Sequence, residues 1–456
     1  MGARRVWAGG VAAIALALVP AASATAHAPP DAQGGGPVAA SADDAQTIAL
    51  RQKYFGAANV DPATGAVRRD KVIMSWFGVT NFAMAIRGHV VLLDAWVPRG
   101  AHSGYVPSSP AELAALRPES IFIGHAHFDH AADAVPIAQA SGATIIGSAE
   151  QCAALRSRAD AMTAPDCVEA LPANAPPGTR AEIPSAIRGV EATIVKHLHS
   201  AGKSPDGKDG YHVPVTPPPS TTQLEHPATP EDMAQLVEHA PDSEAGTVLY
   251  RFRVGDLSLL WNDSAGPLAD DAPGVFDVFR ALRPIDVQVG AIQGFNQITN
   301  GMRDPRMYIE AFAPKLLVPT HHDDWAAGIT TKGENYRAPL DQELTRIPPE
   351  RRPQVRFITD PADYVRPDVL TFDVKYAPLK ITRRCVGSGR ARIAIGGDTA
   401  DLRAVRFRVS GSRKSRLDVR APFTLTTRRT ARVAAAAADF DGSRHILRRS
   451  VRACGG

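Results

Sequence analysis

Short apolar runs alternate with polar segments along most of the chain, from about residue 45 to residue 376. Runs of four to seven residues rich in Val, Ile and Leu predict buried strands, and helical patterns occupy segments between them. The clearest runs are 90–93, 120–123, 190–196, 257–261 and 315–318. This alternation predicts an α+β fold of four layers, an αββα sandwich in which two sheets face each other and helices cover them.

The pattern changes after residue 376. Segments 390–395 and 405–409 alternate between polar and apolar positions, which is typical of strands with one buried face. We therefore predict a second domain at residues 377–456, a small all-β sandwich, after a first domain at 45–376.

Charge is divided unevenly between these regions. From residue 376 onward there are 19 Lys and Arg and 5 Asp and Glu, a net charge of +14, whereas the preceding residues carry 32 basic and 42 acidic residues, a net charge of −10. The basic domain either binds an anionic partner such as a cell-wall polymer or docks on its own acidic domain. We expect no specific nucleic-acid binding, because the sequence contains no motif for it.

Residues 1–28 have the layout of a secretory signal peptide. Two arginines precede an apolar run at 11–19, and small residues with A-x-A spacing follow at 22–28. The run is too short to anchor in a bilayer, and we expect no membrane span elsewhere. Residues 29–44, rich in Ala, Gly and Pro, predict a disordered linker. The mature protein is expected to be secreted.

The four cysteines agree with export, because disulfides persist in oxidising compartments. The simplest of the three pairings joins Cys152 to Cys167 and Cys385 to Cys454. The second bond would tie the first strand of the β-sandwich to its last. Neither pair has the C-x-x-C spacing of a metal site.

An H-x-H-x-D-H motif directly follows the predicted strand at 120–123. The residues of this motif that can bind a metal are His125, His127, Asp129 and His130. His125 and His127 are two residues apart and can point to one side of an extended segment. Asp129 and His130 follow at the strand end, directly before a helical pattern that begins at Ala131, so a second ion could bind there. Imidazole and carboxylate ligands suit zinc first, with iron or manganese as alternatives.

With this motif the chain resembles the metallo-β-lactamase-fold hydrolase superfamily, in its non-lactamase branch. The resemblance requires further ligands after later strands, in a fixed order, and the chain has candidates for each. They are His197 and His199 after 190–196, Asp263 after 257–261, and His321 and His322 after 315–318. Upstream, Asp94 ends the strand at 90–93, where the family has an Asp that orders the metal loop.

The resemblance implies two divalent ions. The ligands implied for the first ion are His125, His127 and His199, and those for the second are Asp129, His130 and His321, with Asp263 bridging both. His197 and His322 stay open as alternative ligands or as hydrogen-bond donors beside them. The candidates for orienting the histidines are Asp94, Asp323 and Asp324.

A two-metal site implies a mechanism. A bridging water becomes hydroxide and attacks a carbonyl carbon or phosphorus, while the ions stabilise the developing negative charge. The catalytic candidates are Asp263, as the bridging ligand, and Asp129, which would orient the nucleophile or carry its proton. No G-x-S-x-G nucleophile motif or G-x-x-x-x-G-K-[ST] phosphate loop occurs.

Residues 201–246 look like an insertion beside the third ligand position. Glycines and prolines interrupt any regular pattern, and only 229–239 predicts a helix, with Thr229 at its start. We expect the insertion to overhang the metal site, with Tyr211, His212 and His226 as candidate substrate contacts. A surface loop without such a role is the alternative. Residues 294–301 are a candidate second rim loop.

The sequence therefore predicts an exported dinuclear-metal hydrolase with a small-molecule substrate, either an ester or lactone or a phosphodiester. Basic residues around the site would favour the phosphodiester, and the candidates are Lys203, Lys208, Arg303 and Arg306. The alternative is a non-catalytic cell-surface binding protein, with a structural metal site and a polyanion-binding β-sandwich.

Overall fold

The computed structural model describes residues 44–456 with gaps at 100–104, 161, 201–210, 213–226, 228, 294–296, 299–301, 326–329, 331, 388, 429, 441 and 455–456. Only the backbone is described at 211–212 and 297–298. The predicted signal peptide at 1–28 and all but the last residue of the predicted linker at 29–44 lie outside the described residues. The last linker residue, Asp44, caps the first helix by accepting a hydrogen bond from the Thr47 N–H.

Two seven-stranded sheets form the first domain. The first has the order β16 (Leu370–Asp373), β1 (Lys71–Trp76), β2 (Phe82–Ile86), β3 (His89–Leu93), β4 (Ser120–Phe122), β5 (Thr144–Ser148) and β6 (Cys167–Leu171). The second has the order β15 (Gln354–Val355), β14 (Leu316–Thr320), β12 (Val287–Ala291), β11 (Leu257–Asn262), β10 (Thr247–Val254), β8 (Glu191–His197) and β7 (Arg180–Glu182).

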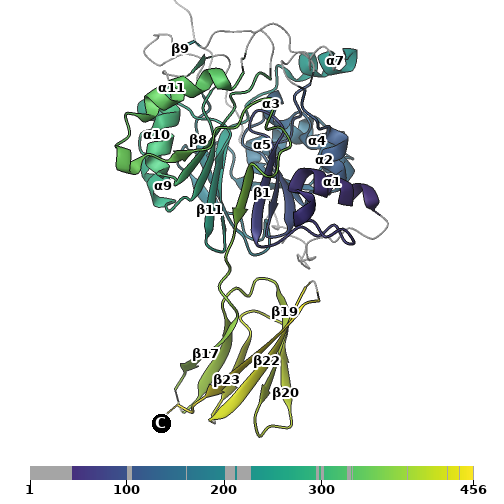
Figure 1. The fold of residues 1–456 in the computed structure, drawn as a ribbon, viewed down its shortest axis with the longest axis vertical. Helices are drawn as coiled ribbons and strands as arrows, with labels where there is room; N and C mark the ends of the chain where they lie inside the picture. The colour runs from purple at the N-terminus through teal and green to yellow at the C-terminus, as the bar shows by residue number, and fades with distance from the viewer. Residues whose placement is uncertain are drawn as a thin grey trace, which may run out of the picture. The chain divides into compact units, whose positions relative to one another are not determined.

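Helices cover the outer faces of both sheets (Figure 1). On the side of the first sheet lie α1 (Ala45–Phe55), α2 (Pro110–Ala115), α4 (Ala134–Ser141) and α5 (Ala149–Ser157). On the side of the second lie α9 (Val275–Ala281), α10 (Arg303–Phe312) and α11 (Glu334–Leu344). The short helix α8 (Leu268–Asp271) packs with α9 and α10 through Leu268. Shorter elements are α3 (Phe128–Ala131), η1 (Ala57–Asn59) and η3 (Pro349–Arg351).

The alternation of side chains along β10 shows why the two sheets face each other. Tyr250 and Phe252 point into the space between the sheets, where the Phe122 ring of β4 lies 5.2 Å and 5.0 Å from theirs. Leu249 points the other way and belongs to the apolar cluster under α9 and α10. A strand buried on both faces needs apolar residues at every position, as the sequence of β10 largely provides. The predicted four-layer αββα sandwich is confirmed.

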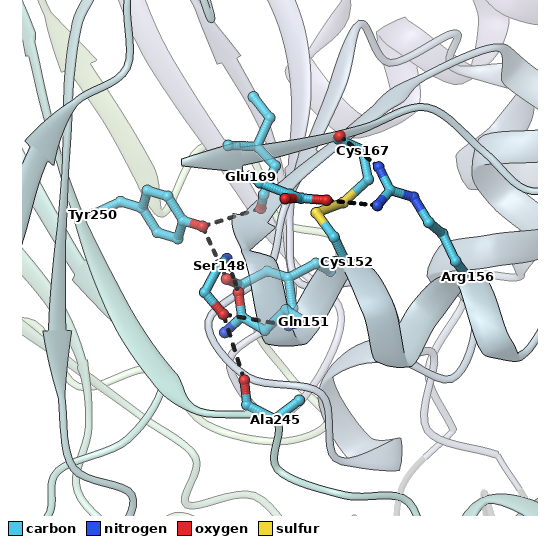
Figure 2. The surroundings of a disulfide bond; sticks show 10 residues. Ser148, Gln151, Cys152, Arg156, Cys167, Glu169, Ala245 and Tyr250 are labelled. Atoms are coloured by element: carbon cyan, nitrogen blue, oxygen red, sulfur yellow. Dashed lines mark hydrogen bonds and ion pairs between the residues drawn. A yellow bond between two sulfur atoms is a disulfide. The ribbon is translucent and has the colours of Figure 1, made fainter. Parts of the chain in front are cut away.

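A disulfide reinforces the first sheet at its edge (Figure 2). Cys152 of α5 is bonded to Cys167 of β6, as predicted. Beside it, Gln151 donates hydrogen bonds to the carbonyl oxygens of Gly124 (2.8 Å) and Gly246 (2.7 Å). The disulfide therefore anchors a helix that holds the residue directly before His125.

The strands from residue 380 onward form two further sheets that pack on each other. One has the order β17 (Lys380–Cys385), β18 (Ala391–Gly396) and β21 (Thr424–Thr427), and the other β20 (Ser415–Asp418), β19 (Leu402–Val409), β22 (Ala431–Asp439) and β23 (Arg444–Val451). Alternate residues of β22 are buried in an apolar core that the two sheets share. The predicted bond Cys385–Cys454 joins β17 to the segment after β23. The all-β sandwich expected here is confirmed.

Candidate metal centre

The predicted ligands gather because four strands end at the same edge. β11, β12 and β14 run parallel, and β8 runs in the same direction because β10 is antiparallel to both β8 and β11. In the facing sheet, β3 and β4 are parallel. The chain leaves the carboxyl ends of β4, β8, β11 and β14 through the segments that carry His125, His199, Asp263 and His321.

The H-x-H-x-D-H motif changes from extended to helical backbone halfway along. His127 is extended and precedes α3, so Asp129 and His130 lie in the first turn of that helix. The helical pattern therefore begins earlier than the sequence suggested, at Phe128 rather than at Ala131. Because of this change in backbone, His125 and His127 face one group of ligands, and Asp129 and His130 face another.

The first group of donor atoms comes from His125, His127 and His199. The His125 Nε2 and His127 Nδ1 atoms are 3.1 Å apart, and the His199 ring centre lies 4.6 Å and 4.7 Å from the centres of the other two rings. One nitrogen of each ring lies within 4.8 Å of the other two, so the imidazoles converge. His199 directs its Nδ1 to the Ser200 carbonyl oxygen (2.7 Å), which leaves Nε2 for a metal.

The second group comes from Asp129, His130 and His321. The His130 and His321 Nε2 atoms are 3.3 Å apart, and the Asp129 Oδ2 atom lies 3.4 Å and 3.5 Å from them. Ligand atoms in a tetrahedral zinc site with bonds of about 2.0–2.1 Å are separated by roughly 3.3 Å. The donor set and its spacing therefore fit a divalent ion of this type.

Asp263 contacts one histidine of each group. Its Oδ2 atom lies 2.6 Å from the His125 Nδ1 atom and 3.6 Å from the His130 Nδ1 atom. Its Oδ1 atom is buried and has no hydrogen-bond partner among the described residues. A buried carboxylate oxygen without a partner is costly unless it binds something.

Asp94 orients the second group, as the sequence suggested. Its Oδ2 atom accepts hydrogen bonds from the His130 Nδ1 (2.7 Å) and the Thr80 hydroxyl (2.8 Å), and its Oδ1 atom accepts one from the Gly124 N–H (3.0 Å). The contact fixes the His130 ring with Nε2 toward Asp129 and His321.

The structure brings His199 and His321 to the cluster, and turns their neighbours His197 and His322 away. The His197 Nδ1 atom lies 3.0 Å from the Leu198 carbonyl oxygen and 3.1 Å from the Tyr308 hydroxyl. The His322 Nε2 donates to the Pro319 carbonyl oxygen (3.0 Å). Within the described part of the chain, neither ring contacts the donor atoms of either group.

Asp323 and Asp324 are buried beside the cluster without bonding to its histidines. Asp323 accepts hydrogen bonds from the Val79 N–H and the Tyr364 hydroxyl. Asp324 accepts one from the Thr330 hydroxyl (2.9 Å). Asp323 supports the site through Val79. It accepts a hydrogen bond from the Val79 N–H, and the Val79 carbonyl oxygen accepts one from the His321 N–H.

Burial sets the protonation of the imidazoles. Burial lowers the pKa of His199 to about 3, and burial followed by the neighbouring histidines lowers the pKa of His125 well below its usual value. These rings are neutral at physiological pH, as metal ligands must be. Burial opposes a charge on His130, but Asp129 and Asp94 outweigh it and raise the pKa of His130 well above the usual value.

Two glycines allow the ligand segments to approach one another. A Cβ atom on Gly124 would lie 2.0 Å from the Asp263 Oδ2 atom, and one on Gly266 would lie 2.5 Å from the carbonyl oxygens of Leu198 and His199. Both approaches are closer than side-chain carbon atoms permit. Asp94 and His321 also have left-handed backbone, with φ of 54° and 58°, a strain that is commonly found at functional sites.

The helix predicted within the insertion is confirmed as α7 (Pro230–His239), with Thr229 as its N-cap. Asp133 lies between α3 and α4, and it accepts hydrogen bonds from Gln235 of α7 and from Arg99. Leu236 of α7 packs against an apolar cluster beside the metal loop, made up of Val79, Trp96, Phe128, Ala132 and Trp325. This part of the insertion therefore covers the segment that carries Asp129 and His130.

Other residues proposed for substrate binding are only partly described. The backbone at Tyr211–His212 (β9) pairs with Gln297–Ile298 (β13), so the two predicted rim segments meet. The side chains of Tyr211 and His212 lie outside the described residues, as do Lys203, Lys208 and His226. Arg303 and Arg306 are described, and both are held in ion pairs, Arg303 with Asp270 and Asp304 and Arg306 with Glu310 and Glu343.

Several residues that build the site were not identified from the sequence. Thr80, Asp133, Ser264 and Tyr308 bond to ligands or to the segments that carry them. Asp133 could have been suspected, because it continues the motif one helical turn after Asp129. The others have no local signal, since their partners lie far away in the sequence.

No protein-family model matches the chain. A UPF0173 metal-dependent hydrolase of Pyrobaculum neutrophilum is 38% identical over 268 residues, 58% of the chain and 90% of the relative. One of Pyrobaculum calidifontis is 26% identical over 270 residues, 59% of the chain and 91% of the relative. Among solved structures, Igni18, a metallo hydrolase of Ignicoccus hospitalis, covers 67% of the chain and 100% of its own length with 13% identity and a TM-score of 0.41.

Proposed function

Since the chain belongs to the UPF0173 metal-dependent hydrolases, we propose that it uses a two-metal centre to hydrolyse a carboxylic ester or a lactone outside the cytoplasm. The observation that carries the two-metal part is the pair of donor groups, one of three imidazoles and one of a carboxylate and two imidazoles. The bridging role of Asp263 is carried over from the resemblance, because its contacts are with the Nδ1 atoms of His125 and His130, on the opposite side of each ring from the donor Nε2 atoms.

The proposal gives each ligand residue a defined role. In this proposal His125, His127 and His199 hold one ion, and Asp129, His130 and His321 hold the other. Bound ions supply a water of lowered pKa and polarise the oxygen of the scissile bond. A carboxylate beside cations stays ionised, so Asp129 can accept a proton when ions are bound. Without an ion, the charge of His130 and hydrogen bonds outweigh burial and hold the pKa of Asp129 well below its usual value.

The cations near the site that the structure describes support a neutral substrate over a phosphodiester. Arg303 and Arg306 are engaged in ion pairs, and Arg99 is tied to Asp133. Arg158 bonds to carbonyl oxygens of the metal loop and to Asp242. A phosphodiester would need some of these guanidinium groups to leave buried or half-buried partners, which is costly.

Export remains part of the proposal and rests on the sequence of residues 1–28 together with the two disulfides. Among the residues that the structure describes, no helix has the length and apolar character to cross a bilayer. Comparing the N-terminal residue of protein recovered from the medium with that of cell-associated protein tests this part separately.

The decisive experiment measures metal content and turnover on the same preparation. The substrates are an aryl ester, a homoserine lactone, a chromogenic phosphodiester and a chromogenic cephalosporin. We expect about two ions per chain and chelator-sensitive turnover of the ester or the lactone. Turnover of the phosphodiester alone would contradict the substrate class. Bound metal without turnover of any substrate would contradict hydrolysis and favour a structural metal site.

A further inference from the structure

The exposed face of the sheet β20-β19-β22-β23 carries arginines from three strands. In β19, alternate residues Phe407 and Val405 enter the core, so Arg406 and Arg408 point outward. By the same alternation the outward residues of β22 and β23 include Arg432, Arg444 and Arg448, all exposed. We call these five residues, Arg406, Arg408, Arg432, Arg444 and Arg448, the arginine face.

The strand register gives the arginine face the form of a groove. Arg408 lies opposite Ala434, and Ala434 lies opposite Arg448, so an alanine separates two arginines in one row across the sheet. Ala436 and Ala438 continue this floor along β22. The surface is hollowed here, and Arg408, Arg432, Ala434 and Arg448 line the hollow. Strand spacing places the two walls about 10 Å apart.

The charges on this face have no ion-pair partner in the described part of the chain. Among the described residues, no member of the arginine face forms an ion pair. The acidic residues of this sheet, Asp418 and Asp439, point toward the core side of their strands, because they pair with Val405 and Leu402. An exposed sheet face whose described residues include five guanidinium groups and no carboxylate attracts polyanions.

We propose that the arginine face binds a linear, phosphate-bearing polymer of the cell envelope, of the polyol-phosphate type. Guanidinium groups match phosphate with two parallel hydrogen bonds, which ammonium groups do not. Alternate residues of a strand are about 7 Å apart, so Arg406 and Arg408 can engage successive anions of one chain that lies along β22. This occupant rests on the proposed export, whereas the binding itself does not depend on hydrolysis.

The shape of the groove argues against other polyanions. No aromatic side chain lies in the rows that contain the arginine face, and single-stranded nucleic acids are held chiefly by stacking on aromatic rings. A nucleic-acid duplex is wider than its own major groove, which is about 12 Å across. It therefore does not fit between walls about 10 Å apart. A membrane would present a plane, which does not reach the alanine floor.

The experiment measures binding of the oxidised full-length protein to synthetic poly(glycerol phosphate) at about 0.15 M salt. The test variant replaces two walls of the groove, Arg408→Gln with Arg448→Gln. The matched control removes the same charge from the opposite sheet of the same domain, Arg384→Gln with Arg392→Gln, both exposed and paired across β17 and β18. Thermal unfolding and ester turnover confirm that the variants are folded.

We expect the groove variant to bind about tenfold or more weakly, with a shallower dependence of affinity on salt, and the control to bind like the original protein. Equal losses in both variants would overturn the proposal, because the effect would then follow net charge alone. It would also be overturned if the original protein preferred duplex DNA, polygalacturonate or phosphatidylglycerol vesicles to poly(glycerol phosphate). Ester turnover in both variants keeps this outcome separate from the outcome for the proposed function.

Discussion

At the residue scale, the buried carboxylate of Asp263 is the group whose chemistry depends most on a bound cation. Burial, followed by the charge of Asp94, raises the pKa of Asp263 well above its usual value. Replacement by Asn keeps the volume and removes the ligand charge. We expect Asp263→Asn to lower metal content below that of the original protein and to reduce turnover about a hundredfold or more, measured by elemental analysis and ester hydrolysis.

The control for this variant is Asp271→Asn, at an exposed position in α8. It changes the net charge equally and should leave both quantities unchanged. Full metal content and normal turnover in Asp263→Asn would remove the bridging assignment.

Gly124 tests how tightly the ligand segments are packed. A Cβ atom there would overlap the Asp263 carboxylate, with contacts of 2.0–2.6 Å. We expect Gly124→Ala to lose about 1–3 kcal/mol of unfolding free energy and most of its metal, measured by denaturant unfolding and elemental analysis. Gly274→Ala is the control, because Gly274 has ordinary backbone angles and open space around it. Equal stability of the two variants would mean that Asp263 can move without cost.

The candidate ligands stand out in the sequence because they are local to one motif or follow predicted strands. Only the resemblance favours His199 over His197, and the structure places His199 beside His125 and His127. The physical reason is Tyr308, which comes from a helix more than a hundred residues away and contacts His197. Contacts of this kind arise only when the sheets and helices are assembled.

At the scale of elements, α7 joins the insertion to the metal loop through one apolar residue. Leu236 contacts the cluster around Trp96 and Phe128, whereas the neighbouring Val237 is 73% exposed. If α7 forms part of the substrate site, Leu236→Ser should raise KM with little change in kcat, because loosening the helix removes binding and leaves the ligands in place. Steady-state kinetics with the ester measures both.

Val237→Ser supplies the matched control, with the same loss of apolar surface from the same helix. It should behave like the original protein. A change in kcat without a change in KM in Leu236→Ser would instead assign α7 to the support of Asp129 and His130.

The Cys152–Cys167 disulfide holds α5 in the position from which Gln151 reaches Gly124. The bond closes a loop with a sequence separation of 15 residues, for which chain entropy predicts about 3 kcal/mol of stabilisation. We expect the double variant Cys152→Ser with Cys167→Ser to lose about this much and to bind metal more weakly. The control is Cys385→Ser with Cys454→Ser, which should destabilise the β-sandwich without affecting metal content.

Elements were predictable where one face or both faces of a strand are buried. β10 and β19 show this, since their apolar positions follow the burial they experience. The pairing of β9 with β13 was not predictable, because it depends on two loops that meet only in the folded protein.

At the scale of the whole molecule, the hydrophobic cores are separate. The clusters around the two large sheets contain residues up to Val374, and the β-sandwich has a cluster of its own that starts at Ile381. Polar contacts connect the regions, since the buried Arg87 is ion-paired with Asp398 and Asp401. The opposite net charges of the two regions, which the sequence shows, agree with their separate cores. The ion-pair partners of Arg87 could not be predicted from the sequence.

Separate cores predict two unfolding transitions with different dependence on metal. A ligand that binds only the folded state stabilises it by RT ln(1 + [L]/Kd), about 2.7 kcal/mol when its concentration is a hundred times Kd. The proposed ions bind only between the two large sheets, so a chelator should lower the Tm of that transition and leave the transition of the β-sandwich in place. A reductant should lower both, because each region contains one disulfide. Scanning calorimetry of the full-length protein, with chelator and reductant added separately, measures these shifts. A single transition that moves as a whole with chelator would show that the ion pairs of Arg87 couple the two regions into one cooperative unit.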